Sequence, residues 1–212
     1  MKKRFLAFII LLLAASCQAQ DNQQQQHVSR LIGGPCEGCE AIYEYGDKHL
    51  SPVDTLPDFH QAYGPKLKVT GTIYQRDGKT PASGIILYVY HTDQTGVYPT
   101  KGNENGWARR HGYLRGWIKT DADGSYTFYT LRPGTYPSRT DPAHIHVTIK
   151  EPDKSEYYLD DFQFDDDPLL TSQERASRKN RGGSGIVTLQ QEGNLLVAKR
   201  DIILGLNIPD YE

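Results

Sequence analysis

Two histidines, His144 and His146, lie two positions apart in a segment, residues 143–150, whose composition favours a β-strand. Side chains at positions i and i+2 of a strand leave the same face, and their stems lie about 6–7 Å apart. Two imidazole rings at that separation can bind one ion, because metal–nitrogen bonds are about 2.0–2.1 Å long. Two ordinary strand histidines would have the same spacing, so a metal site requires further ligands.

Two tyrosines are the nearest candidates for those ligands. Tyr136 lies eight residues before His144, and Pro137 favours extended geometry at Tyr136. Tyr98 follows a strongly apolar segment, residues 85–90. A free phenol has a pKa of about 10, so two tyrosinates at neutral pH require a strongly Lewis-acidic cation. Iron(III) is a hard ion that accepts phenolate and imidazole, whereas zinc rarely binds tyrosine; copper or zinc on the histidine pair alone is the alternative.

Short strands separated by turns must position these side chains. Turn sequences such as Asp77-Gly78 and Asp123-Gly124 separate segments rich in β-branched and aromatic residues. This spacing predicts an all-β fold, an antiparallel β-sandwich of short strands with long loops and at most one short helix. The expected helix covers residues 169–179, and the expected strands cover residues 66–74, 85–90, 125–130, 143–150, 156–164, 186–190 and 195–204.

Residues 1–19 predict an export segment. Basic residues at positions 2–4 precede an apolar run, residues 5–15, that is too short to span a bilayer comfortably. The small residues that end in Cys17 resemble the lipobox of bacterial lipoproteins, in which that cysteine carries lipid. We therefore expect an exported protein, either a periplasmic or cell-envelope lipoprotein attached to a membrane through Cys17 or, with cleavage after Ala19, a secreted protein.

The chain has three cysteines, so lipidation of Cys17 would leave Cys36 and Cys39 as a pair. A zinc ribbon would need a second cysteine pair, and a thioredoxin-like motif would need a βαβ pattern around it. In an oxidising compartment we predict a structural Cys36–Cys39 disulfide that fixes an N-terminal arm. The expected organisation is a flexible tether and arm over residues 20–60, followed by one domain over residues 61–212.

The length of the chain limits the number of domains, and its net charge limits the classes of binding partner. The 212 residues suffice for one domain of ordinary size with tails. A formal net charge of −2 gives no strong field toward a polyanion, so no nucleic-acid partner is expected.

The sequence Tyr-Pro-Ser-Arg at residues 136–139, followed by Pro-Ala-His-Ile-His at residues 142–146, resembles the intradiol ring-cleavage dioxygenases. This is the family of catechol 1,2- and protocatechuate 3,4-dioxygenase. Further matching motifs at residues 114–116, 120–128 and 133–134 extend the resemblance over roughly residues 66–204. It implies a β-sandwich that binds a non-haem iron(III) through Tyr98, Tyr136, His144 and His146.

The resemblance also implies the reaction. A small aromatic diol of the catechol type chelates the iron, and the displaced Tyr136 takes up one of its protons. Both atoms of O₂ enter the ring, which opens between the hydroxyls to a cis,cis-muconate-type diacid. Family members assemble in several ways, so a homo-oligomer is compatible with the resemblance.

Two positions depart from the family pattern. Asp141 stands where the well-studied enzymes have an arginine directly before Pro-Ala-His, and Asp161 aligns with a glutamine of the protocatechuate enzymes. Either Arg139 or Arg115 could replace the missing positive charge. These departures favour the alternative function, a catalytically impaired or non-enzymatic binding module that resembles the prealbumin-like domains of exported proteins.

Three other residues are weaker candidates. His91 and His111 could support the ligands, although their sequence positions favour solvated loop histidines. Trp107 could line a pocket for an aromatic ring or pack on the sandwich.

Overall fold

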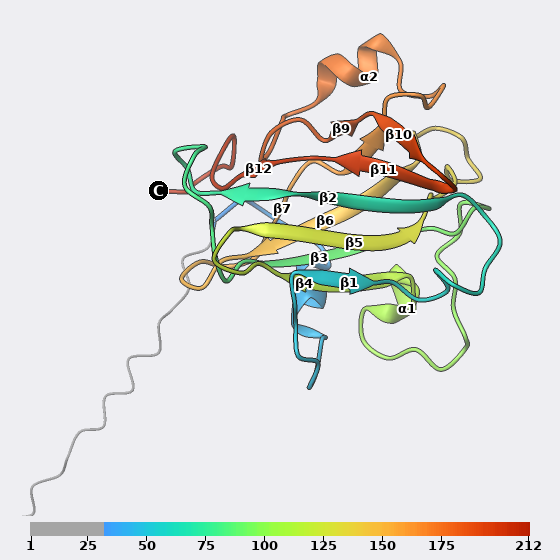
Figure 1. Cartoon of the computed structure of the whole chain (residues 1–212), viewed down its shortest axis with the longest axis horizontal. Coiled ribbons are helices and arrows are strands. Elements are labelled where there is room, and N and C mark those ends of the chain that lie inside the picture. Colours follow the sequence, from blue (N-terminus) through green and yellow to red (C-terminus); the bar gives the residue numbers. More distant parts are fainter. Residues whose placement is uncertain (1–31) are drawn as a thin grey trace, which may run out of the picture.

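Two β-sheets packed face to face form the described part of the chain (Figure 1). The structure is a computed structural model that describes residues 32–212. Cys17 and the expected export segment lie outside these residues. Within residues 32–212, we find no helix with the length and apolar character needed to cross a membrane.

The first sheet is ordered β1-β5-β2-β11-β10, and β12 also pairs with β2. Its longest strand, β2, has every second side chain buried, as the alternation of polar and apolar residues requires. The strand bounds are β1 (Val53–Thr55), β2 (Lys66–Tyr74), β5 (Ser125–Leu131), β10 (Leu189–Glu192), β11 (Leu195–Lys199) and β12 (Ile202–Ile203).

The second sheet is ordered β4-β3-β6-β8-β9, and β7 also pairs with β6. Its central strands β3 and β6 are antiparallel neighbours, with Tyr90 opposite His146. The strand bounds are β3 (Ile86–His91), β4 (Arg115–Lys119), β6 (His144–Lys150), β7 (Tyr157–Tyr158), β8 (Phe162–Phe164) and β9 (Ile186–Val187).

The N-terminal arm covers the outer face of the second sheet. Its 3-10 helix η1 (Cys39–Tyr43) buries Ala41 and Ile42 against Tyr88 and Trp117. The main core lies between the two sheets, so β3 is buried on both faces, which explains why this strand is apolar throughout. Residues 53–55 of the arm form β1 and belong to the first sheet.

The predicted all-β sandwich is confirmed, but the expectation of purely antiparallel sheets is wrong. Four pairs are parallel, namely β1–β5, β11–β2, β12–β2 and β8–β9. Alternation of side chains reports which face of a strand is buried and carries no information on the direction of its partner.

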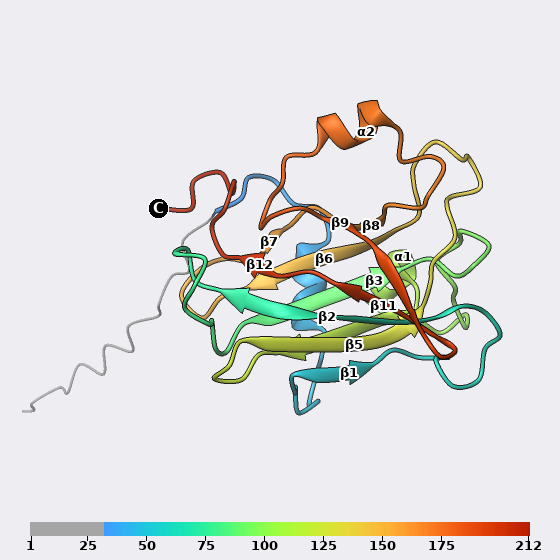
Figure 2. The same cartoon turned by 45° about the horizontal axis from the view of Figure 1, so that its top comes forward.

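The expectation of at most one short helix is also wrong. Besides η1, the described residues contain α1 (Ala108–His111) and α2 (Ser172–Ser177). A helix of one turn, such as α1, is too short to show a hydrophobic period. The second helix is shorter than the expected 169–179 because it buries no residue, and its start is fixed by Thr171, whose side chain accepts from the Glu174 amide. Figure 2 shows α2 outside both sheets.

Candidate metal centre

Strand β6 places two candidate ligands on the outer face of the second sheet. The side chains of Ile145 and Val147 point into the core, so those of His144 and His146 point the other way. Tyr98 lies in the loop after β3, and Tyr136 lies in the loop between β5 and β6. Three separate segments therefore bring the four predicted ligands to one place.

The four donor atoms lie close together. Tyr98 Oη is 2.6 Å from Tyr136 Oη and 2.8 Å from His146 Nε2. Tyr136 Oη is 3.1 Å from His144 Nε2 and 3.3 Å from His146 Nε2, and the two Nε2 atoms are 3.2 Å apart. Four donor atoms that bind the same ion, each at a distance of about 2 Å, lie about 3 Å from their neighbours in the coordination shell. The cluster thus has the dimensions of a coordination shell.

The histidine tautomers support the same conclusion. His144 Nδ1 lies 2.7 Å from the Pro142 carbonyl oxygen, and His146 Nδ1 lies 3.1 Å from Asp161 Oδ1. Both acceptors require a proton on Nδ1, so the two Nε2 atoms carry lone pairs that face each other. Two neutral imidazole lone pairs and two phenol oxygens converging on one point fit a hard cation such as iron(III), which accepts both donor types.

The protein without a cation keeps both phenols protonated. Burial raises the pKa of Tyr98 above its ordinary value, and the hydrogen bond with Tyr136 raises it further. Burial also raises the pKa of Tyr136, where the Tyr98 hydrogen bond opposes the increase and the carboxylates of Asp161 and Asp141 add to it. Ionisation of the tyrosines therefore requires the positive charge of a bound metal.

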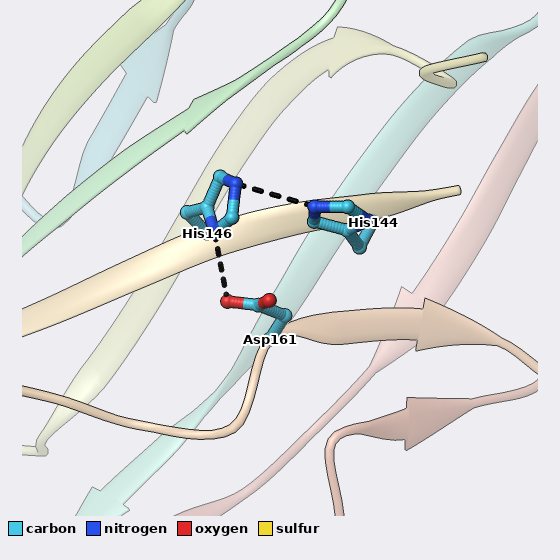
Figure 3. Close-up of side chains that lie close together, drawn as sticks. All are labelled: His144, His146 and Asp161. Carbon is cyan, nitrogen blue, oxygen red and sulfur yellow. Dashed lines mark hydrogen bonds and ion pairs between the residues drawn. The ribbon is translucent and has the colours of Figure 1, made fainter. Parts of the chain in front are cut away.

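A bulge in the second sheet aims Asp161 at His146. Between the pair Thr148↔Tyr158 and the pair Ile145↔Phe162, strand β6 advances by three residues and its partner by four. The extra residue interrupts the single strand expected over 156–164, and Asp161 lies in the interruption. Figure 3 shows its carboxylate beside one ring nitrogen of His146, Nδ1, while the other, Nε2, faces His144.

This position makes Asp161 a support for His146 rather than a fifth member of the cluster. The carboxylate accepts from Nδ1, whereas Nε2 faces the tyrosines. A carboxylate behind a metal-binding histidine fixes the tautomer and ring orientation and makes the imidazole a better donor. Burial opposes ionisation of Asp161, but its interaction with His146, which includes the hydrogen bond from Nδ1, lowers its pKa overall.

Two glycines let the two tyrosine loops touch. A Cβ atom on Gly96 would lie 1.9 Å from the Thr135 carbonyl oxygen, and one on Gly134 would lie 2.3 Å from the Gln94 carbonyl oxygen. Gly96 also has φ +82°, a conformation that side chains rarely adopt. Close backbone packing at Gly96 thus sets the position of Tyr136 relative to the loop that carries Tyr98.

We expect Gly96→Ala to separate the two tyrosine loops. The strained φ and the steric clash should lower the free energy of unfolding by more than about 1 kcal/mol, and the metal content should fall. Gly102→Ala is the matched control, since Gly102 has φ +88° but open space around its Cβ position. Chemical denaturation and metal analysis would measure both effects; equal losses in the two variants would contradict the role of the loop contact.

Aromatic side chains form one wall of the space in front of the cluster. Tyr90 stacks on His146 with ring centroids 4.5 Å apart, and His111 stacks on Tyr90 at 3.8 Å. Trp107 continues the series at 5.3 Å from His111. Beside them is a cavity of about 260 Å³ lined by Glu37, Tyr90, Tyr98, Trp107, Arg110, His111, Tyr136 and His146.

A larger cavity of about 410 Å³ shares Glu37, Tyr90 and His146 with the first. Asp161 and Arg178 also line it. The donor cluster therefore has open space next to it, with flat aromatic surfaces that suit a planar ring.

Neither arginine expected to replace the missing charge lines these two cavities. Arg115 forms an ion pair of 2.5 Å with Glu44 and lies over the ring of Trp117. Arg139 is exposed, in the turn after Tyr136. Asp141 is exposed as well, and its carboxylate accepts from Thr140 Oγ1 at 2.7 Å.

The expectation that His91 and His111 are solvated is wrong. His91 is fully buried, with Nδ1 donating to the Thr92 carbonyl oxygen and Nε2 next to Thr130 Oγ1. His111 is buried under Tyr88, whose hydroxyl lies 2.9 Å from its Nδ1. Burial lowers the pKa of each histidine to about 4, so both are neutral at neutral pH.

The structure joins Cys36 and Cys39 in a disulfide. Their loop approaches α1, because a Cβ atom on Gly38 would lie 2.8 Å from His111 Nε2. No local sequence pattern identifies three of the cavity residues, Tyr90, Glu37 and Arg110. Tyr90 lies opposite His146 because of the register between two strands. Glu37 meets Arg110 although the two residues are 73 positions apart in the sequence.

Known proteins resemble this chain in sequence and fold. A dioxygenase family model, Dioxygenase_C, matches residues 43–194. Catechol 1,2-dioxygenase 1 of Acinetobacter lwoffii is 31% identical over an alignment of 159 residues that covers 66% of this chain and 47% of that protein. The protocatechuate 3,4-dioxygenase beta chain of Burkholderia cepacia is 26% identical over an alignment of 177 residues that covers 76% of this chain and 75% of that chain.

A solved structure supports the fold. The dioxygenase domain of a dioxygenase carbohydrate-binding protein fusion from Streptomyces sp. SirexAA-E superposes with a TM-score of 0.56 at 23% identity, covering 75% of this chain and 94% of that one. The present chain spans about half the length of the Acinetobacter enzyme. Since the family model alone covers most of its residues, the chain belongs to the intradiol ring-cleavage dioxygenase family.

Proposed function

We propose that this protein is a non-haem iron(III) dioxygenase that opens a catechol-type aromatic ring between its two hydroxyls, with O₂ as co-substrate and a cis,cis-muconate-type diacid as product. The observation that carries the proposal is the convergence of two phenol oxygens and two imidazole Nε2 atoms, each of which lies within 3.3 Å of at least two of the others. Family membership supports a ring-cleaving dioxygenase in general.

Each part of the site has a role in this proposal. Tyr98, Tyr136, His144 and His146 hold the iron, which when bound withdraws electron density from a chelated diol and so makes its ring reactive toward O₂. Tyr136 Oη would accept a proton from the incoming diol, because burial raises its pKa and so gives its phenolate form a high proton affinity. The stacked wall formed by Tyr90, His111 and Trp107 orients the planar ring.

The alternative is a binding module without catalysis, favoured by Asp141 at the position of the family arginine. Anaerobic titration of the iron protein with catechol, followed by addition of O₂, separates the two functions. We expect a burgundy protein whose tyrosinate-to-iron absorption shifts with catechol, and O₂ uptake with formation of the diacid. A spectral shift without O₂ uptake would support the binding module, and a protein that stays colourless after iron reconstitution would exclude both iron-dependent functions.

We also propose that the protein is exported and attached to a membrane through a lipid on Cys17, as the resemblance to a lipobox suggests. Cys17→Ser is then expected to move the protein from the membrane fraction to the soluble fraction and to abolish incorporation of labelled palmitate. Cys36→Ser, which removes a cysteine far from the cleavage region, is the control and should keep the label. Labelling of both variants alike would argue against lipidation at Cys17.

A further inference from the structure

The cavity in front of the donor cluster has a single cation among its lining residues, Arg110. Of the two histidines that also line it, His111 is neutral because burial lowers its pKa to about 4, and His146 donates from Nδ1 to Asp161 and directs Nε2 at the tyrosines. Tyr98, Tyr136 and His146 line the same cavity, so Arg110 faces the space that a substrate would occupy. No other residue of this cavity offers a positive charge.

Arg110 is held from two sides. Its guanidinium lies 5.5 Å from the ring centroid of Trp107, and it forms an ion pair with Glu37. The side chains of Arg110 and Glu37 are 62% and 73% exposed, so water screens their attraction. Exposed ion pairs contribute little to stability, so another anion can replace Glu37 at low cost.

The disulfide loop delivers Glu37 to this place. Glu37 stands between Cys36 and Cys39, which the disulfide joins, and the adjacent Gly38 packs on His111 and Trp107. The carboxylate of Glu37 already occupies the position in which an anionic group would meet the guanidinium. It therefore marks an anion subsite at the edge of the aromatic wall.

We propose that Arg110 is a substrate-binding residue that recognises negative charge on an aromatic ring, and that Glu37 competes with the substrate for the same guanidinium. This inference rests on the proposed function, in which the diol gives up protons on binding and its ring becomes anionic. The positive charge of a guanidinium beside that ring favours the ionised form of the diol. The negative charges of Asp141 and Asp161 oppose ionisation of the diol. Planar packing against Tyr90 and Trp107 accounts for a preference for aromatic anions.

Two substitutions that break the same ion pair from opposite sides test the proposal. The probe is benzoate, compared with its neutral counterpart benzamide, titrated by calorimetry into the protein as isolated and without O₂. We expect Arg110→Gln to weaken benzoate binding about five- to tenfold and Glu37→Gln to tighten it by a smaller factor, with benzamide unaffected by either. Arg109→Gln is the matched control, because Arg109 is an exposed neighbour on α1 that does not line the cavity.

The two variants are expected to change the affinity for benzoate in opposite directions, and an ion pair with a purely structural role would not produce that result. If the pair only fastened the disulfide loop to α1, both substitutions would change benzoate and benzamide binding in the same direction, and the inference would be overturned. Wild-type benzoate affinity in Arg110→Gln, in a protein that holds iron and cleaves diols, would overturn this inference alone. Absence of iron and of ring cleavage in the wild-type protein would overturn the proposed function, while the benzoate comparison would still report on Arg110.

Discussion

Tyr98→Phe and Tyr136→Phe are each expected to remove most of the bound iron and the burgundy colour. Each change deletes one phenol oxygen from the donor cluster and leaves the ring in place, so packing around the site is retained. Two histidines and a single phenolate give a hard iron(III) ion too few anionic donors. Iron analysis and the visible spectrum after reconstitution would measure the loss.

The tyrosine variants also distinguish the metal. If copper or zinc bound to His144 and His146 alone, both variants would keep the metal content of the wild-type protein. Tyr90→Phe is the control, since Tyr90 lines the same cavity but its hydroxyl is not one of the four converging donors. It should keep both iron and colour.

Turnover by whatever iron remains is expected to differ between the two tyrosine variants. In the proposed function Tyr136 has a second role as proton acceptor, and loss of a positioned general base costs about 10²–10⁴-fold in rate. We expect Tyr136→Phe to lose more activity per bound iron than Tyr98→Phe, as measured by O₂ uptake normalised to iron. Equal losses would indicate that Tyr136 acts only as a ligand.

The ligand strand could be predicted from sequence because its signal is local. The alternation over residues 66–74 gave β2 with its observed bounds, and His-x-His placed two side chains on one face of β6. Tyr98 and Tyr136 lie in loops, where no periodicity operates. Their approach to the histidines was implied only by the resemblance to a family, and the contact at Gly96 shows how the fold brings it about.

The surroundings of the cluster could not be predicted, because they depend on register and on long-range contacts. A continuous strand was expected over 156–164, where one extra residue produces the bulge that carries Asp161. The strand β4 (Arg115–Lys119) and the helix α1 were not foreseen, since each is short and lacks a clear period. Sequence reasoning therefore assigns to Arg115 a charge that we propose for Arg110, which lies in α1 just before β4 and lines the cavity.

The arm connects these features. Residues of the arm cover Tyr88 and Trp117 on the outer face of the second sheet, and that face also carries His144 and His146. The disulfide loop of the arm also reaches the cavities beside that face, because Cys36 and Glu37 line the larger one together with His146. The disulfide loop thus contributes to the site in two ways, as part of the cover and as the origin of Glu37.

Asp161→Ala is expected to lower the affinity of the site for iron about 10- to 100-fold, although Asp161 does not face the metal position. The change removes the acceptor at 3.1 Å from His146 Nδ1. His146 can then rotate, or place its proton on Nε2, and in either case the lone pair directed at the cluster is lost. Competition with a coloured iron chelator would measure the affinity.

Asp161→Asn is the matched variant for that experiment. Its amide oxygen can still accept from His146 Nδ1, so it should keep most of the affinity that Asp161→Ala loses, while the missing negative charge leaves the imidazole a weaker donor. A residue that orients a ligand should give a graded loss of iron affinity, from wild type through Asp161→Asn to Asp161→Ala, without a loss of thermal stability. A residue needed only for folding would lower thermal stability in the same order. We expect the melting temperatures of the three proteins without metal to be alike, since the Asp161 side chain is partly exposed and lies in a bulge rather than in the core. A parallel fall in melting temperature and in iron affinity would contradict the positioning role.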